Sequence, residues 1–171
     1  MHVEFAELEL PRFVNYDSDP TVLAALALYN TPLFEKDRYP GPPLQGMNAR
    51  LINDFVVDRR KAFVAFGEDK APIAVACYEG NYRVRRTALL ERLVVAESIQ
   101  ERGVGRFMID NLAVVTQRRG LEDLRVRSLA SVIGFYATLG FVADEIVSVK
   151  PYLPYMKLDV RSRISVPSLI I

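Results

Sequence analysis

The sequence is poor in reactive side chains, with a single cysteine, a single histidine and no tryptophan among its 171 residues. One cysteine excludes an intrachain disulfide framework and is typical of a reducing compartment. The only histidine, His2, stands near the chain end, which disfavours zinc chemistry or serine–histidine catalysis. We therefore expect no metal, and we expect Cys77, which lies within an apolar run, to be a buried and inert thiol.

Long hydrophobic runs are also absent. No apolar stretch approaches the roughly 20 residues that span a bilayer. The first residues include glutamates, where a signal peptide would have a basic region followed by an apolar core. We therefore expect a cytoplasmic protein with no membrane partner.

Charge of either sign is not in excess, because 22 basic and 21 acidic residues leave a formal net charge of +1. That balance argues against a broad electrostatic nucleic-acid binder. What the chain does have is 50% hydrophobic residues over a one-domain length, enough for a substantial core. We predict one domain over residues 1–160 and a tail over 161–171. The apolar end of that tail favours docking on the body or on a partner, so a homodimer is one expectation.

Hydrophobic periodicity and helix-stop signals predict the element order β-α-α-β-β-β-α-β-α-β-β. The expected strands cover about 2–10, 62–66, 73–78, 88–96, 124–129, 141–149 and 152–160, and the expected helices about 21–30, 48–61, 104–119 and 131–139. Gly120 and Gly140 follow two of these helices, where glycine commonly ends a helix. Strands and helices mixed in this order predict an α+β layered domain with one mixed sheet.

The stretch from Leu93 to Phe107 joins an apolar strand to an amphipathic helix through a loop with two glycines. The first N–H groups of a helix lack internal partners, and the helix dipole places partial positive charge there. Glycines at such a point let a phosphate approach the backbone. The pattern therefore predicts an anion site, with a tight strand-to-helix turn that binds nothing as the alternative.

The kind of phosphate ligand follows from what the loop does not contain. A dinucleotide fingerprint needs a third glycine where Met108 stands, and a Walker loop needs a Gly-Lys-Ser/Thr that the chain lacks. What remains is Gln100-x-x-Gly103-x-Gly105. This resembles the Gln/Arg-x-x-Gly-x-Gly/Ala loop of the GNAT acetyltransferase superfamily, which grips the pyrophosphate of coenzyme A.

Two further segments extend the resemblance over roughly the last 75 residues of the chain. Residues 135–141 read Phe-Tyr-Ala-Thr-Leu-Gly-Phe, similar to the Phe-Tyr-x-x-Leu-Gly-Phe segment of that superfamily. Residues 155–160 are similar to its closing strand. The resemblance implies a GNAT-like mixed, mostly antiparallel sheet of about six to seven strands with helices on both faces. It also implies acetyl-CoA as cosubstrate and the 31–47 loop as a substrate lid, although a solvated connector is the alternative for that loop.

The implied reaction moves an acetyl group from the thioester to a primary amine of a small molecule or peptide. The resemblance places Tyr136 near the sulfur as proton donor and Glu91 on the strand as base, with Glu79 in reserve. From spacing alone, Tyr136 is instead a core aromatic residue, and Glu91 is half of a structural ion pair. The alternative function is an acyl-CoA-binding module of the same fold with weak or absent catalysis.

The same resemblance assigns a set of residues to the cofactor. Backbone N–H groups of the strand end would face the thioester carbonyl and the pantetheine arm, and those of the loop would hold the pyrophosphate. The predicted cofactor residues are Leu93, Val94, Val95, Gln100, Glu101, Arg102, Gly103, Val104, Gly105, Arg106 and Ser131. One departure is Leu129, which stands where many relatives have an asparagine that binds pantetheine. Either a nearby serine substitutes for it, or the lower half of the cofactor arm is held differently.

Overall fold

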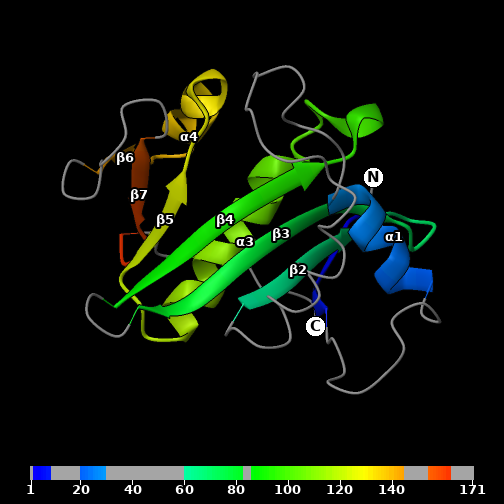
Figure 1. Cartoon of the computed structure of the whole chain (residues 1–171), viewed down its shortest axis with the longest axis horizontal. Coiled ribbons are helices and arrows are strands. Elements are labelled where there is room, and N and C mark those ends of the chain that lie inside the picture. Colours follow the sequence, from blue (N-terminus) through cyan, green and yellow to red (C-terminus); the bar gives the residue numbers. More distant parts are fainter. Residues whose placement is uncertain (1, 9–19, 30–59, 83–85, 145–153, 163–171) are drawn as a thin grey trace, which may run out of the picture. The chain divides into compact units, whose positions relative to one another are not determined.

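The computed structural model describes residues 2–8, 20–29, 60–82, 86–144 and 154–162 (Figure 1). Their seven strands form one sheet in the order β1-β2-β3-β4-β5-β7-β6. The strands are β1 (Glu4–Leu8), β2 (Arg60–Phe66), β3 (Pro72–Tyr82), β4 (Thr87–Val95), β5 (Asp123–Arg127), β6 (Val142–Ala143) and β7 (Tyr155–Asp159). The helices are α1 (Pro20–Tyr29), α3 (Val104–Arg118) and α4 (Ile133–Thr138), with the short 3₁₀ turns η3 (Glu97–Ile99) and η4 (Ala130–Val132).

The sheet is mixed and mostly antiparallel, as predicted. β4 and β5 run parallel, whereas β1 with β2, β5 with β7 and β6 with β7 pair antiparallel. Among the described residues, no helix is long and apolar enough to cross a bilayer.

The predicted end of one helix is wrong. The sequence pattern predicts that Arg60 and Lys61 end a helix over 48–61, but they begin strand β2. Lys61 forms an ion pair with Glu7, and the register of β2 with β1 includes the pair Leu8 and Ala62. Pairing with a distant strand therefore overrides the local helical pattern. Residues 48–59, the 31–47 loop and most of the strand predicted at 141–149 lie outside the described residues.

The chain divides into two compact units, and β3, β4 and α3 contribute residues to both. One unit comprises Met1–Tyr78 with Arg92–Met108, and the other comprises Glu79–Glu91 with Ile109–Ile171. The prediction of a single domain over residues 1–160 stays a prediction.

The first unit buries apolar side chains on both faces of its strands. On one face, α1 places Ala25 and Tyr29 against Val64, Val75 and Cys77. Cys77 is thus buried and forms no disulfide, as expected.

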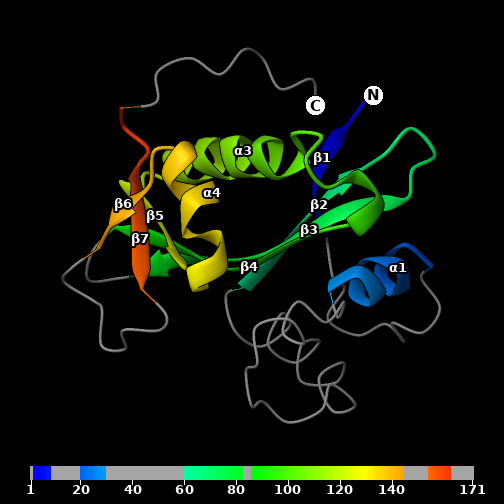
Figure 2. The same cartoon turned by 90° about the horizontal axis from the view of Figure 1, so that it is seen from above.

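On the opposite face of this unit lies an aromatic cluster. Phe63 stacks on Phe5 with ring centroids 5.3 Å apart and meets Tyr78 edge-on at 5.5 Å. Phe107 of α3 approaches Phe5 at 6.4 Å. Successive strand residues point to opposite faces, so the first turn of α3 and helix α1 lie on opposite sides of these strands (Figure 2).

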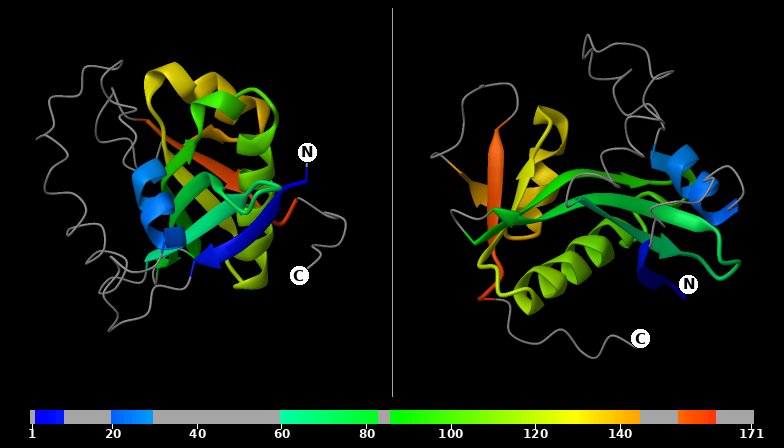
Figure 3. Two further views of the ribbon diagram at one scale, coloured as in Figure 1. Left: turned by 90° about the vertical axis from the view of Figure 1, so that its right-hand side faces the viewer. Right: turned by 60° about the horizontal axis from the view of Figure 1, so that its bottom comes forward.

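The second unit is built around β5 and β7, which lie side by side (Figure 3). Their alternate residues Leu124, Val126, Met156 and Leu158 are buried. The Cβ that an alanine would place at Gly140, just after α4, would lie 3.6 Å from Leu158 Cδ1, so these buried residues face the α4 side. The other face of the two strands carries the charged side chains.

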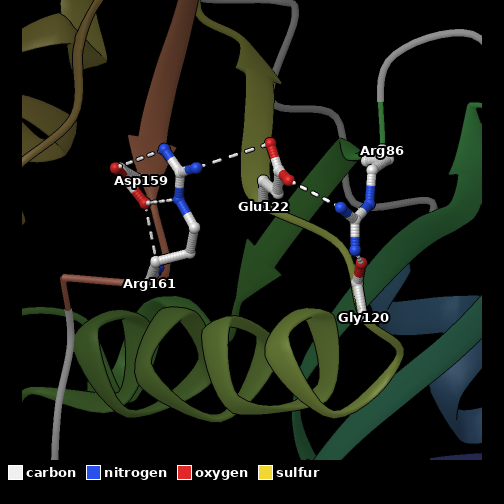
Figure 4. Close-up of polar contacts among 5 residues, drawn as sticks. All are labelled: Arg86, Gly120, Glu122, Asp159 and Arg161. Atoms are coloured by element: carbon white, nitrogen blue, oxygen red, sulfur yellow. Dashed lines mark hydrogen bonds and ion pairs between the residues drawn. The ribbon is translucent and has the colours of Figure 1, made fainter.

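A set of ion pairs lies at one end of this second unit (Figure 4). Arg86 donates to Glu122 at 2.9 Å and to the carbonyl of Gly120, just after α3, at 3.1 Å. Arg161 binds Asp159 through two hydrogen bonds of 3.0 Å, which hold the pKa of Asp159 below its usual value. These pairs are mostly exposed to solvent, which screens their charges, so we expect each to add little to stability.

Candidate functional site

The loop between β4 and α3 ends at a glycine that begins the helix. The N–H of Phe107 donates to the carbonyl of Gly103 at 2.9 Å, which makes Gly103 the N-cap residue of α3. Gly103 has φ +84°, a conformation that favours glycine. Because it has no side chain, it cannot supply the capping oxygen that serine or aspartate would give. Within the described part of the chain, the N–H groups of Val104, Gly105 and Arg106 donate to no other residue, so they are left for an external acceptor.

Two hydrogen bonds fix the start of this loop. The N–H of Ala96 donates to Ile73 of β3 at 2.9 Å, and the Gln100 side-chain amide donates to the carbonyl of Val95 at 3.2 Å. Glu101 has φ +66°, so the chain turns sharply between Gln100 and Gly103. The Gln100 side chain braces the loop, a role that the sequence pattern does not reveal.

The residues of this loop differ in their exposure to solvent, and the exposed and buried ones have different roles. Glu101, Arg102, Gly103 and Arg106 are exposed, whereas Val104 is only 2% exposed. Val104 thus anchors the first turn of α3 in the core, and two arginines stand beside the open N–H groups. A negatively charged ligand fits this arrangement because helix dipole, free donors and guanidinium groups act in the same direction.

Strand β4 leads into the loop and carries Glu91. Its register with β5 runs from Thr87 to Leu90, and the strand then continues to Val95. Glu91 is half-buried and lies one residue past the last pair of that register. The predicted cofactor residues Leu93, Val94 and Val95 follow it.

Arg92, next to Glu91, packs against helix α1. Its guanidinium lies 4.8 Å from the ring centroid of Tyr29, a cation–π contact. Burial lowers the pKa of Arg92 from its usual value, and the nearby Tyr29 and Cys77 oppose that shift. Sequence reasoning misses Tyr29, because nothing in its local pattern points to a residue so distant in the chain.

Tyr136 lies in α4, where Gly140 (φ +88°) ends the helix. The N–H of Phe141 donates to the carbonyl of Tyr136 at 3.1 Å, and the N–H of Gly140 donates to that of Ala137 at 3.0 Å. These two bonds define a Schellman motif, in which the residue after the glycine packs on the last turn. The rings of Phe141 and Tyr136 accordingly meet with centroids 5.3 Å apart.

The burial of Tyr136 has an electrostatic consequence. The residue is 6% exposed, and burial raises the pKa of its phenol to about 12. Within the described chain, its hydroxyl takes part in no hydrogen bond. Tyr136 is thus a packed aromatic residue, as the spacing predicts, whose phenol stays protonated and is not used by the described residues.

The serines near Leu129 differ in their surroundings. Ser128 is 1% exposed, and its hydroxyl donates to the carbonyl of Leu129 at 2.9 Å. The hydroxyl of Ser128 therefore already donates its hydrogen to the backbone and is not available as a donor to a ligand. Ser131 is exposed in η4, so of the two serines it is the one that a ligand could reach. The described residues include no cluster of acidic, histidine or cysteine side chains that could hold a metal ion.

Three comparisons place the chain among known proteins. The model of the acetyltransferase (GNAT) family matches residues 20–141. A search of curated proteins finds no match. Many solved structures do match. The three described next have low sequence identity to this chain.

An acetyltransferase from Thermus thermophilus is 20% identical with a TM-score of 0.69, over 93% of this chain and 97% of that one. A GNAT-family acetyltransferase from Staphylococcus aureus is 8% identical with a TM-score of 0.68, over 93% and 99%. A spermidine N-acetyltransferase chimera that includes Vibrio cholerae sequence is 16% identical with a TM-score of 0.66, over 94% and 96%. At these identities the structures show a shared fold, while the family match covers most of the chain. The chain belongs to the GNAT acetyltransferase family, in which acetyl transfer from acetyl-CoA is general.

Proposed function

We propose that this protein is an N-acetyltransferase that binds acetyl-CoA at the Gln100–Arg106 loop and passes the acetyl group to a primary amine by direct attack. The observation that carries the proposal is the side-chain-free N-cap of α3. Gly103 leaves the first N–H groups of the helix open, and the exposed Arg102 and Arg106 flank them. A pyrophosphate matches that set of donors and charges.

The exposed loop suits a large ligand that remains partly in solvent. Its start is held by Gln100 and Ala96, and its end by the buried Val104. A braced loop loses little conformational freedom when a ligand binds, which favours affinity. The N–H groups after Leu93 on β4 are our proposed site for the thioester carbonyl, because hydrogen-bond donors there would stabilise the oxyanion.

Tyr136 is our proposed partner of the leaving sulfur. Its pKa of about 12 lies well above the ~8.5 of an ordinary thiol. The phenol would therefore stabilise the thiolate as a hydrogen-bond donor, and net transfer of its own proton would be uphill. The proton that finally neutralises the sulfur can come from the attacking amine, which must lose one.

Glu91 is our proposed base, directly or through a water. An aliphatic ammonium has a pKa near ~10, so a neutral nucleophile at pH 7 needs a base or a desolvating path. The position of Glu91 just past the β4–β5 register favours this role, while its half-buried state is equally compatible with a structural ion pair.

Thermal melting with acetyl-CoA tests the cofactor site. Ligand at 100 times its dissociation constant adds about 2.7 kcal/mol to stability, which at this chain size raises Tm by roughly 5–10 °C. Gly105→Glu should abolish the shift, since it places a carboxylate in the first turn of α3. NADH, which shares a pyrophosphate but lacks the pantetheine arm, should give a smaller shift.

Gln117→Glu is the control for that variant. Gln117 is exposed in the last turn of the same helix, α3, at the end away from the loop. The control should keep the full acetyl-CoA shift. If acetyl-CoA gives no shift in the unmodified protein, the proposed cofactor site is wrong.

The second candidate is an acyl-CoA-binding module with weak or no catalysis, favoured by the close packing of Tyr136 against Phe141. Tyr136→Phe and Glu91→Gln separate the two candidates. An enzyme should lose much of kcat in at least one variant with acetyl-CoA binding retained. A cytoplasmic location and a homodimer stay predictions from the sequence.

A further inference from the structure

One face of strands β5 and β7 carries only polar or charged side chains. Their register pairs Asp123 with Asp159, Arg125 with Lys157 and Arg127 with Tyr155. Directly paired residues share a face, so these six side chains lie together, opposite the buried Leu124, Val126, Met156 and Leu158. Along this face the charge changes from acidic at Asp123 and Asp159 to basic at Arg127 and Lys157.

Two of the five charges on this face are balanced within the fold. Arg161 neutralises Asp159, and Arg125 Nε lies 2.9 Å from Asp144 Oδ2, a carboxylate that is fully buried. Arg127 and Lys157 are different. Within the described residues neither takes part in an ion pair, and Lys157 is half-buried.

Arg127 and Lys157 are diagonal neighbours on the face, so their Cα atoms are about 7–8 Å apart. A carboxylate could contact both side chains at once, and the Arg127 guanidinium offers a planar fork that matches it. Tyr155, paired with Arg127, adds a phenol at the same place.

The position of this pair connects it to the reaction. β5 runs parallel to β4, and Arg127 is the last residue of β5. Glu91 directly follows Leu90 and Arg127 directly follows Val126, the last pair of the β4–β5 register, so Glu91 and Arg127 lie at the same end of these two strands. The chain runs from Arg127 through Ser128 and η4 directly to α4, which carries Tyr136 and packs on the opposite face of β5 and β7.

We propose that Arg127 and Lys157 bind a carboxylate carried by the amine acceptor, so that the preferred acceptor is an amine with an acidic group close by. This inference rests on the proposed acetyl transfer, whose acceptor it specifies. The near-neutral chain as a whole gives no such preference; the local pairing of β5 with β7 creates it.

Peptide binding in the presence of coenzyme A tests the proposal without turnover. The probes are two peptides with a free N-terminal alanine and a C-terminal fluorophore, one continuing Glu-Glu and the other Gln-Gln. Fluorescence anisotropy at low salt should show the acidic peptide binding about tenfold tighter, because each exposed charge contact contributes a few-fold. Unlabelled glutamate as competitor distinguishes a small acid, which would displace the peptide fully, from a peptide acceptor.

Variants assign the preference to the two residues. The double variant Arg127→Gln with Lys157→Gln should bind the two peptides equally. Arg127→Glu should reduce the affinity for the acidic peptide still more, because it adds a like charge. Arg118→Gln removes an exposed arginine from α3 and should keep the tenfold preference. Melting of each variant shows that it is folded.

The outcomes separate this inference from the proposed function. If acetyl-CoA stabilises the protein but the two peptides bind equally, the acidic acceptor is wrong and the acetyltransferase proposal stands. If acetyl-CoA has no effect, the proposed function is wrong. In that case a peptide preference that the double variant abolishes would still establish the carboxylate site, and equal binding would overturn it too.

Discussion

The loop before α3 and the segment that ends α4 both depend on a glycine with positive φ, yet they use it in opposite ways. At Gly103 the glycine begins a helix, and no residue in the described ranges accepts a hydrogen bond from the first N–H groups of that helix. At Gly140 it ends a helix, and the orphan carbonyls of α4 accept bonds from Gly140 and Phe141. Among the described residues, the first glycine thus leaves donors without an acceptor, while the second helps to provide donors for the last carbonyls of its helix.

The comparison separates binding from packing. A helix start without a capping side chain is a ready site for an anion. A helix end closed by a Schellman motif instead presses Phe141 against Tyr136 and makes the Tyr136 ring part of the core. We therefore expect changes at the first segment to reduce ligand affinity and changes at the second to reduce stability.

The largest expected effect is at Tyr136. Tyr136→Ala removes a ring packed on Phe135 and Phe141 and should lower the free energy of unfolding by about 3–5 kcal/mol. Tyr136→Phe keeps the ring and should stay within about 1 kcal/mol of the unmodified protein. Urea unfolding measures both. A loss below about 1 kcal/mol in Tyr136→Ala would mean that the second segment is not a packing element.

The next largest expected effect is a loss of stability at alkaline pH. Burial raises the pKa of Tyr136 from 10.0 to about 12 in the folded protein. A raised folded pKa gives stability that is complete below the unfolded value and disappears as the pH passes the folded one. Between pH 10 and 12 the protein should thus lose about 2–3 kcal/mol relative to Tyr136→Phe.

The Tyr136→Phe variant is the proper reference because every other group that titrates at high pH is common to both proteins. Urea unfolding of the pair at several pH values between 8 and 12 measures the difference. A constant difference across that range would show that the Tyr136 phenol is not desolvated.

The smallest expected effect comes from alanine substitutions at the two glycines, and it tests the difference between the two segments most directly. Gly103→Ala and Gly140→Ala each force a Cβ into a positive-φ conformation and should cost about 1 kcal/mol of stability. The new Cβ meets nothing within 4 Å at Gly103 and only Leu158 at an ordinary 3.6 Å at Gly140, so backbone strain dominates in both. Only Gly103→Ala should also weaken the binding of acetyl-CoA, which calorimetry measures. Equal weakening in both variants would contradict the division between binding and packing.

Much of the fold follows from local sequence signals. Gly120 and Gly140 are predicted to end helices, and both have positive φ just after α3 and α4. The Gln100–Gly105 pattern is predicted at a helix start, and Gly103 caps α3. These predictions succeed because a glycine requirement depends on backbone conformation, which a few neighbouring residues decide.

Local signals fail where a distant strand or helix sets the environment. The helix expected through Lys61 gives way to β2, because pairing with β1 fixes Arg60 and Lys61 as strand. The contact of Arg92 with Tyr29 joins β4 to α1, and no spacing rule relates those two residues.

Local sequence is enough to specify most of the order of elements, the helix-stop glycines, the family resemblance and the loop that we propose as the phosphate site, because each depends on residues close together in the chain. The tertiary structure is needed to show that Tyr136 is buried against Phe141, that β4 continues past its register with β5, and that Arg127 and Lys157 share a face. Burial and strand register are properties of partners that meet only after folding, and no local pattern encodes them.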